Sequence, residues 1–216
     1  MSYRKVSLVG ILSIGLLSGC FGEKPEENLF VAFENAAKQE KSLFEDTKKL
    51  EALEKQGQEL YTQIIKEGKE HNEAVAQKLD QAVSNVEERE KVLKSEKDAL
   101  EKAQKETKSV QSNIEKIEDK QIQKQAKKVE EAYKNRYDAF QKMNENYVKL
   151  MAIEKELYAK LKVKETKVKE ISGKVTEVNK LTEEMQKEKE KFNGCTKEYN
   201  EGKLAFYKDA KIKVKE

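Results

Sequence analysis

The chain has 216 residues, 39% of them charged and 37% hydrophobic, and its 44 basic and 41 acidic side chains leave a formal net charge of +3. A sequence with 1 proline and abundant Lys, Glu, Ala, Leu and Gln is typical of long exposed helices rather than a thick globular core. Arginine occurs only at Arg4, Arg89 and Arg136, which argues against nucleic acid as a partner because nucleic-acid readout relies on bidentate guanidinium contacts.

The first twenty residues have the pattern of an export signal. Arg4 and Lys5 form a positive region, residues 6–17 are predominantly apolar, and small residues precede Cys20. The apolar run of about a dozen residues is shorter than the roughly 20 that a membrane-spanning helix needs. We therefore predict that residues 1–19 are a signal peptide rather than a permanent transmembrane anchor.

The end of this segment, Leu17-Ser18-Gly19-Cys20, looks like the lipobox of bacterial lipoproteins. In proteins with this motif the cysteine receives a diacylglyceryl group and becomes the first mature residue, and two acyl chains suffice for stable anchoring. The motif predicts membrane lipid as a partner through Cys20, on the outer face of the cytoplasmic membrane. Cleavage would leave 42 basic and 41 acidic residues, so no partner is implied by bulk charge.

Residues 20–27 are predicted to form a short tether, and residues 28–216 a helical body without a single proline. The turns of this body are expected where the seven-residue apolar repeat changes phase. A first repeat runs from Leu29 to Ile64 and a second from Val75 to Ile117. The change between them predicts a turn at residues 68–72.

A third repeat begins at Ile122, which predicts a second turn at residues 118–120. It continues to Phe206 in one register, so two interpretations remain open: a third turn at Ser172-Gly173 and four helices, or one helix from about 122 to 192 and three helices. We favour four because helices of matched length cover one another's apolar faces. The predicted fold is all-α, an elongated antiparallel up-and-down helical bundle of long coiled-coil-like helices. The same seams could pair between two chains, although the broad aromatic faces favour a bundle.

The sequence contains few residues suited to catalysis or to metal binding. The only histidine, His71, lies in the first predicted turn, where a solvated loop residue is expected. With Cys20 acylated, Cys195 has no partner for an internal disulfide, and a zinc site of Cys and His is excluded by number. Glycine-rich phosphate loops and nucleophile elbows are absent from the sequence. We expect no enzyme activity, no cofactor and no metal.

Aromatic residues are concentrated in the third predicted helix. Tyr133, Phe140 and Tyr147 follow the seven-residue seam and are expected in the core, which leaves Tyr137 and Tyr158 as candidates for an exposed contact with a glycan or a partner protein. The C-terminal end is rich in lysine, which could contact anionic lipid or teichoic acid if the topology returns it to the anchored start. Its lysines are Lys203, Lys208, Lys211, Lys213 and Lys215.

The lipobox, the short tether and a Lys/Glu-rich helical body opening with Glu27-Asn28-Leu29-Phe30 resemble the cell-wall-binding lipoproteins of Bacillus and Staphylococcus, the YkyA-like family. This resemblance covers essentially the whole chain. It implies an elongated helical bundle without established enzymatic activity, and it carries over no functional residue other than Cys20. The leading hypothesis is a non-catalytic surface lipoprotein that contacts cell-wall polymer. The alternative is a helical scaffold that binds an envelope protein and no glycan.

Overall fold

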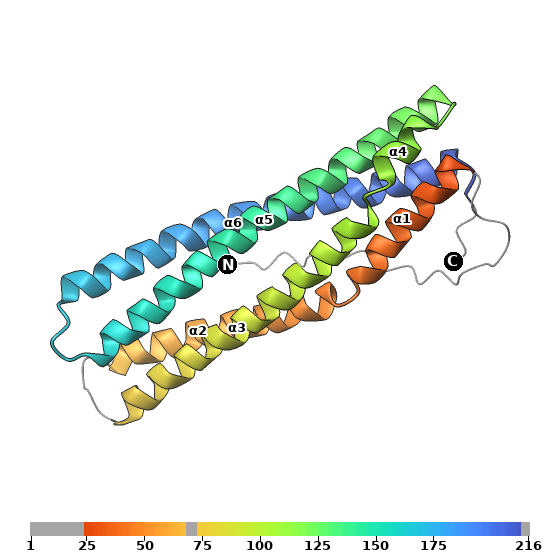
Figure 1. Ribbon diagram of the computed structural model, residues 1–216. Helices are drawn as coiled ribbons and strands as arrows, with labels where there is room; N and C mark the ends of the chain where they lie inside the picture. Colours follow the sequence, from red (N-terminus) through yellow and green to blue (C-terminus); the bar gives the residue numbers. More distant parts are fainter. Residues whose placement is uncertain (1–23, 68–72, 213–216) are drawn as a thin grey trace. The chain divides into compact units, whose positions relative to one another are not determined.

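The computed structural model describes residues 24–67 and 73–212, and these residues form six α-helices and no strand (Figure 1). The helices are α1 (Pro25–Gln39), α2 (Leu43–Glu67), α3 (Glu73–Glu106), α4 (Val110–Glu115), α5 (Lys120–Lys162) and α6 (Val168–Asp209). In chain order they make four arms: α1 with α2, α3 with α4, α5, and α6. The predicted all-α, up-and-down helical bundle and the preference for four arms over three are confirmed.

The structure bears on the three predicted turns in different ways. The first, at residues 68–72, lies outside the described residues, between the end of α2 and the start of α3. The second is confirmed, because α5 begins at Lys120 directly after Asp119. The Oδ1 atom of Asp119 accepts hydrogen bonds from the backbone N–H groups of Gln121 and Ile122, at 2.8 and 3.1 Å. An N-terminal cap of this kind satisfies donors that the first helical turn leaves unpaired.

The third turn lies at residues 163–167, not at Ser172-Gly173, which is inside α6. Gly173 requires no turn because it stands in open space, with no heavy atom within 4 Å of a Cβ placed on it. The turn itself is made by Val163-Lys164-Glu165-Thr166-Lys167, which contains no glycine or proline. The prediction of a turn at Ser172-Gly173 was therefore wrong in position. It took the glycine as a helix breaker, but Gly173 lies within a continuous helix.

Two further interruptions have no counterpart in the sequence prediction. The first arm breaks at residues 40–42, and the second breaks at residues 107–109, where the Thr107 hydroxyl donates to the Gln104 carbonyl at 2.8 Å. In addition, α1 begins at Pro25, inside the segment predicted to be tether, and proline suits the first helical turn because that turn lacks a backbone acceptor for its N–H.

The described residues divide into two compact units. Unit 1 comprises residues 24–42, 98–140 and 189–212, and unit 2 comprises the described residues of 43–97 together with 141–188. Each unit contains segments of all four arms.

In unit 2 neighbouring arms run antiparallel. Asp46 near the start of α2 accepts a hydrogen bond from Ser95, whereas Leu53, further along α2, accepts one from Asn85, earlier in α3. The α5 and α6 segments are related in the same way, through Lys160 with Glu170 and Lys174 with Glu156. The apolar core of this unit includes Leu60, Leu79, Val86, Leu93, Leu150, Met151 and Tyr158.

Unit 1 is also antiparallel, with an aromatic core. The Phe30 ring contacts Tyr207 at a centroid distance of 4.9 Å, and the Phe33 ring contacts Tyr199 at 6.0 Å. A later residue of α1 thus meets an earlier residue of α6, so the two helices are antiparallel. On α5, Tyr133 contacts Tyr199 at 5.2 Å. Edge-on and tilted ring pairs of this kind add to the free energy gained by burying the rings.

The C-terminal end of α6 is closed by a Schellman motif. The Ile212 N–H donates to the Tyr207 carbonyl at 2.9 Å and the Lys211 N–H to the Lys208 carbonyl at 3.1 Å, with Lys211 at a φ of 57°. Ile212 packs on the core of unit 1, as the residue after the left-handed position usually does in this motif. The end of α6 is thereby fixed beside the start of α1.

Candidate functional site

The three residues predicted as sites have different outcomes. Cys20 lies outside the described residues. Tyr137 lies half-buried on α5 in unit 1, and its role as a contact residue stays a prediction. Tyr158 is only 3% exposed and belongs to the core of unit 2, so the expectation that it is exposed was wrong. Leu157 and Tyr158 are both buried because the apolar face of α5 is wider than a strict seven-residue seam. Tyr133, Phe140 and Tyr147 are buried, as predicted.

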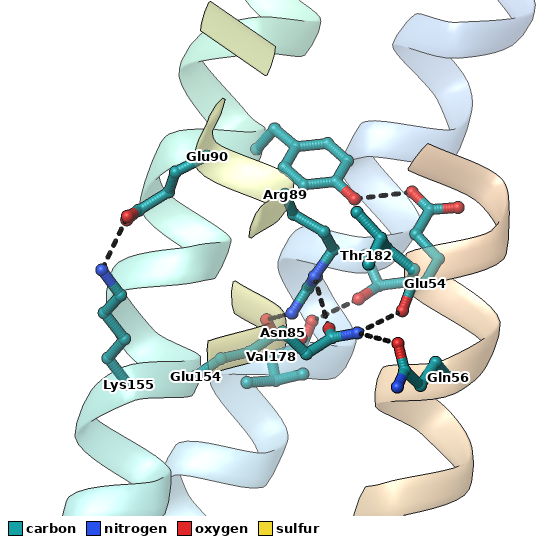
Figure 2. A network of polar contacts seen from close by, with 11 residues as sticks. Glu54, Gln56, Asn85, Arg89, Glu90, Glu154, Lys155, Val178 and Thr182 are labelled. Carbon is teal, nitrogen blue, oxygen red and sulfur yellow. Dashed lines mark hydrogen bonds and ion pairs between the residues drawn. The ribbon is translucent and has the colours of Figure 1, made fainter. Parts of the chain in front are cut away.

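Among the described residues, each unit contains a buried polar cluster that is centred on an arginine. In unit 2, Arg89 on α3 forms an ion pair with Glu154 on α5, with side chains 5% and 15% exposed (Figure 2). The Arg89 Nε atom also donates to Asn85 Oδ1 at 3.1 Å. Asn85 in turn donates to the Leu53 carbonyl at 2.9 Å and to Gln56 Oε1 at 3.3 Å. The cluster therefore joins α2, α3 and α5.

Two neighbouring contacts complete the unit 2 cluster. The Tyr147 hydroxyl donates to Glu54 at 2.7 Å, which links α5 to α2 a second time. At the more exposed edge, Lys155 contacts Glu90 at 2.7 Å (Figure 2). Gly57 is buried opposite Asn85, and a Cβ at position 57 would lie 2.8 Å from Asn85 Oδ1. The absence of a side chain at position 57 is what admits the amide between the helices.

The electrostatics of this cluster favour a fixed ion pair rather than a proton donor or acceptor. Burial acts to lower the pKa of Arg89, but attraction to Glu154 and Tyr147 and the hydrogen bonds to them together outweigh it, and the pKa is raised. Burial raises the pKa of Glu154, and Arg89 opposes that shift. Burial also raises the pKa of the Tyr158 phenol, to about 12. The guanidinium is therefore held charged and occupied by the protein's own carboxylate.

In unit 1, Arg136 on α5 is held by Glu40, the residue that follows α1, and by residues of α6. Its Nη1 and Nη2 atoms donate to the two carboxylate oxygens of Glu40, each at 2.7 Å, and its Nε atom donates to the Thr196 hydroxyl at 2.9 Å. The guanidinium carbon lies 4.9 Å from the centroid of the Phe192 ring. A bidentate, stacked arrangement of this kind is specific to arginine.

A second polar contact in unit 1 involves Glu34. Its Oε1 atom accepts hydrogen bonds from the Lys203 ammonium and the Tyr207 hydroxyl, each at 2.9 Å. Both donors belong to α6, so this contact holds α6 against α1. Lys203 was predicted as part of a lysine-rich contact surface, but it is half-buried in this internal ion pair.

The remaining candidates offer no reactive centre among the described residues. Cys195 is half-buried, and burial, with a contribution from Glu198, raises the pKa of its thiol, so the thiol is protonated at neutral pH. Within residues 24–67 and 73–212, no group of three or more His, Cys, Asp or Glu residues is placed to hold a metal ion. His71 lies outside these ranges.

Sequence reasoning missed both ion pairs, although one signal was present. Arg89 lies three residues after Val86 and four before Leu93, and Arg136 lies three residues after Tyr133 and four before Phe140. Both arginines thus occupy inward-facing seam positions in a body where the other basic residues are lysine or His71. An arginine at such a position predicts a buried carboxylate partner, because an unpaired buried charge is too costly. The pattern does not identify which carboxylate.

The fold and these clusters define an all-α helical-bundle protein whose buried charges are compensated within each unit. Among its described helices, none combines the length and the apolar character that a bilayer span requires. Residues 24–209 match the YkyA family, described as "Putative cell-wall binding lipoprotein", and the chain belongs to this family. It is 29% identical over 200 residues to "Uncharacterized lipoprotein YkyA" of Bacillus subtilis (strain 168), an alignment that covers 93% of this chain and 90% of that protein. No solved structure matches the chain.

Proposed function

We propose that this chain is a non-catalytic surface lipoprotein, held by acyl chains on Cys20 at the outer face of the cytoplasmic membrane. Its helical body contacts cell-wall polymer, either peptidoglycan or teichoic acid. The observation that carries the proposal is the family match over residues 24–209, because the family's description combines the two properties, lipoprotein and cell-wall binding. The lipobox at Leu17-Ser18-Gly19-Cys20 agrees with the first of them.

The arrangement of charges supports contact through the helix surface rather than through an internal site. Arg89 and Arg136 are occupied by Glu154 and Glu40 and are not available to a ligand. Many lysines remain exposed on the described helices, and these flexible cations suit a repeating anionic polymer, which demands no planar bidentate fit. Weak contacts repeated along a polymer add up through multivalency.

The anchor is tested by replacing Cys20 with alanine in the producing cell, with Cys195→Ser as the matched control for loss of a thiol. We expect the Cys20 variant to leave the membrane fraction and the Cys195 variant to remain in it. A Cys20→Ala protein retained by the membrane as well as the wild type would contradict acylation at this residue.

The wall contact is tested with the full-length lipidated protein in detergent micelles. The protein is sedimented at physiological salt with purified peptidoglycan, once with and once without its covalently attached teichoic acid. We expect co-sedimentation with at least one of the two, and the difference between them identifies the polymer. Absence of the protein from both pellets would count against a wall ligand.

A protein partner is the second candidate, and one observation favours it. Val163 is the first residue of the connection between α5 and α6 and Val168 is the first residue of α6, and the two side chains are 52% and 63% exposed. In this version the chain is a scaffold that binds an envelope protein through apolar contact. Crosslinking and mass spectrometry on intact cells would recover one stoichiometric protein neighbour, and Val163→Ser with Val168→Ser would abolish its recovery. Unchanged recovery from that double variant would exclude this surface.

A further inference from the structure

Three segments of unit 1 end at the same level. At the first turn of α1, Asn28 Nδ2 donates to Asn113 Oδ1 on α4 at 3.4 Å, and Phe30 contacts Tyr207 on α6. Since helices advance about 1.5 Å per residue, the few residues that follow Asn113 and Tyr207 reach about the level of Lys24. We call this surface the end face and define it as residues 24–28, 116–120 and 208–212.

The end face is separated from the lipid-bearing residue by a very short piece of chain. Only four peptide steps connect Cys20 to Lys24, and a fully extended chain of that length spans at most about 14 Å. The acyl chains on Cys20 enter the bilayer, so the start of α1 is confined to the vicinity of the headgroups. Because α4 and α6 are packed on α1, the residues beside that start are confined with it.

We propose that the end face rests on the lipid headgroup layer of the membrane that holds Cys20; this inference depends on the acylation in the proposed function. It assigns a membrane contact to the last turn of α6 and to the connection before α5, which lie about 190 and about 100 residues from the anchor along the chain but beside it in space.

The chemistry of the end face suits a headgroup layer. Apolar side chains at the rim of the end face pack on the core of unit 1 and are only half-buried. Exposed lysines with long flexible side chains lie near them. Two of its carboxylates are used internally, since Asp119 caps α5 and Asp209 accepts a hydrogen bond from Gln125. The apolar residues are Phe30, Ile122 and Ile212, and the exposed lysines are Lys24, Lys116, Lys120, Lys208 and Lys211.

Lipid is favoured over wall polymer as the occupant because of the tether and not because of net charge. Glu26, Glu27 and Glu118 lie on the same surface and offset much of the lysine charge. An anionic polymer in free solution would therefore gain little at this surface. Because the acylated chain is already attached to the membrane, the end face meets lipid headgroups at a high effective concentration.

The test uses full-length lipidated protein reconstituted in vesicles of phosphatidylcholine and phosphatidylglycerol that carry a nitroxide quencher on a fraction of the headgroups. In a Cys195→Ser background, a fluorophore is attached at Glu118→Cys or Lys211→Cys. The matched control is Lys41→Cys, an exposed site in the same unit, 17 residues and therefore about 25 Å further along the first arm. We expect quenching several-fold stronger at positions 118 and 211 than at 41.

Each outcome bears on the inference. Vesicle-bound protein in which positions 118 and 211 are unquenched, or are quenched no more than position 41, overturns it while leaving the anchor intact. Protein that fails to float with the vesicles overturns the acylation in the proposed function and removes the premise of the inference. Positions 118 and 211 belong to separate segments, so a fluorophore that disturbs one does not compromise the other.

Discussion

The close approach of α2 and α3 in unit 2 depends on a single residue that has no side chain. Gly57 faces Asn85, whose amide is held by the Leu53 carbonyl and whose oxygen accepts from Arg89. An amide fixed at both ends cannot retreat from an added methyl group. A larger residue at position 57 would therefore disturb the polar cluster that joins α2, α3 and α5.

Replacing Gly57 with alanine is expected to destabilise the protein, although alanine is the better helix former. The new Cβ would lie 2.8 Å from Asn85 Oδ1, and overpacking of this kind typically costs about 1–3 kcal/mol. Gly173→Ala is the matched control, since nothing lies within 4 Å of a Cβ there, and it should gain up to about 1 kcal/mol from helix propensity. Urea unfolding followed by circular dichroism measures both, and equal effects at the two glycines would contradict the role given to Asn85.

The end of α1 is fixed by one carboxylate. Glu40 follows the last residue of α1 and binds Arg136 through both of its oxygens, while Arg136 also donates to Thr196 on α6. One buried ion pair thus ties the C-terminal end of α1 to α5 and, through Arg136, to α6. The exposed pair of Lys48 and Glu45, at 3.6 Å, has no such role.

Removing the partner of Arg136 should therefore cost much more than removing a surface carboxylate. Glu40→Ala would leave a buried guanidinium without its counter-ion, and such losses typically amount to about 3–5 kcal/mol. Glu45→Ala should change the free energy of unfolding by less than about 1 kcal/mol. Urea titrations measure both variants, and hydrogen exchange should show faster exchange in α1 for the first alone. Similar stability of the two variants would mean that the Arg136 pair contributes little.

The elements could be predicted from the sequence only where the apolar repeat itself changes. The phase shift between Ile117 and Ile122 located the turn before α5, and Asp119 supplies its cap. The turn after α5 could not be located, because residues 163–167 are Lys, Glu, Thr and Val, which a helix also accepts, and the register continues beyond them. The break at residues 40–42 lies beside Glu40, which pairs with Arg136 across 96 positions of the chain, a contact that local periodicity does not show.

The candidate site was predicted less well than the fold. Local periodicity placed Tyr133 and Tyr147 in the core correctly, but it assigned Tyr158 to the surface because that residue lies one step off the seam. How wide a buried face is depends on how many helices surround it, which the repeat of one helix does not specify. The partners of Arg89 and Arg136 are likewise set by packing between arms.

At the scale of the whole molecule, tyrosine is the main titratable group in the core of the described residues. Tyr133, Tyr147, Tyr158, Tyr199 and Tyr207 are buried, and they are divided between the two units. Burial is the largest cause that raises the pKa of each phenol, and for Tyr158 the value reaches about 12. In the unfolded chain the same phenols titrate near their ordinary value of about 10.

The protein is therefore expected to unfold cooperatively in alkali. A phenol whose pKa is higher in the folded state contributes stability that is complete below about pH 10 and is lost as the pH rises through the folded pKa, because the unfolded chain releases the proton first. Each unit of pKa difference corresponds to about 1.4 kcal/mol per tyrosine. Absorbance of phenolate at 295 nm and loss of helix by circular dichroism should rise together above pH 10. Tyr158→Phe should move this transition to higher pH, since it removes one of the phenols whose ionisation favours unfolding. Ionisation of all the tyrosines near pH 10 with the helices intact would show that the five buried phenols are accessible to solvent in the folded protein.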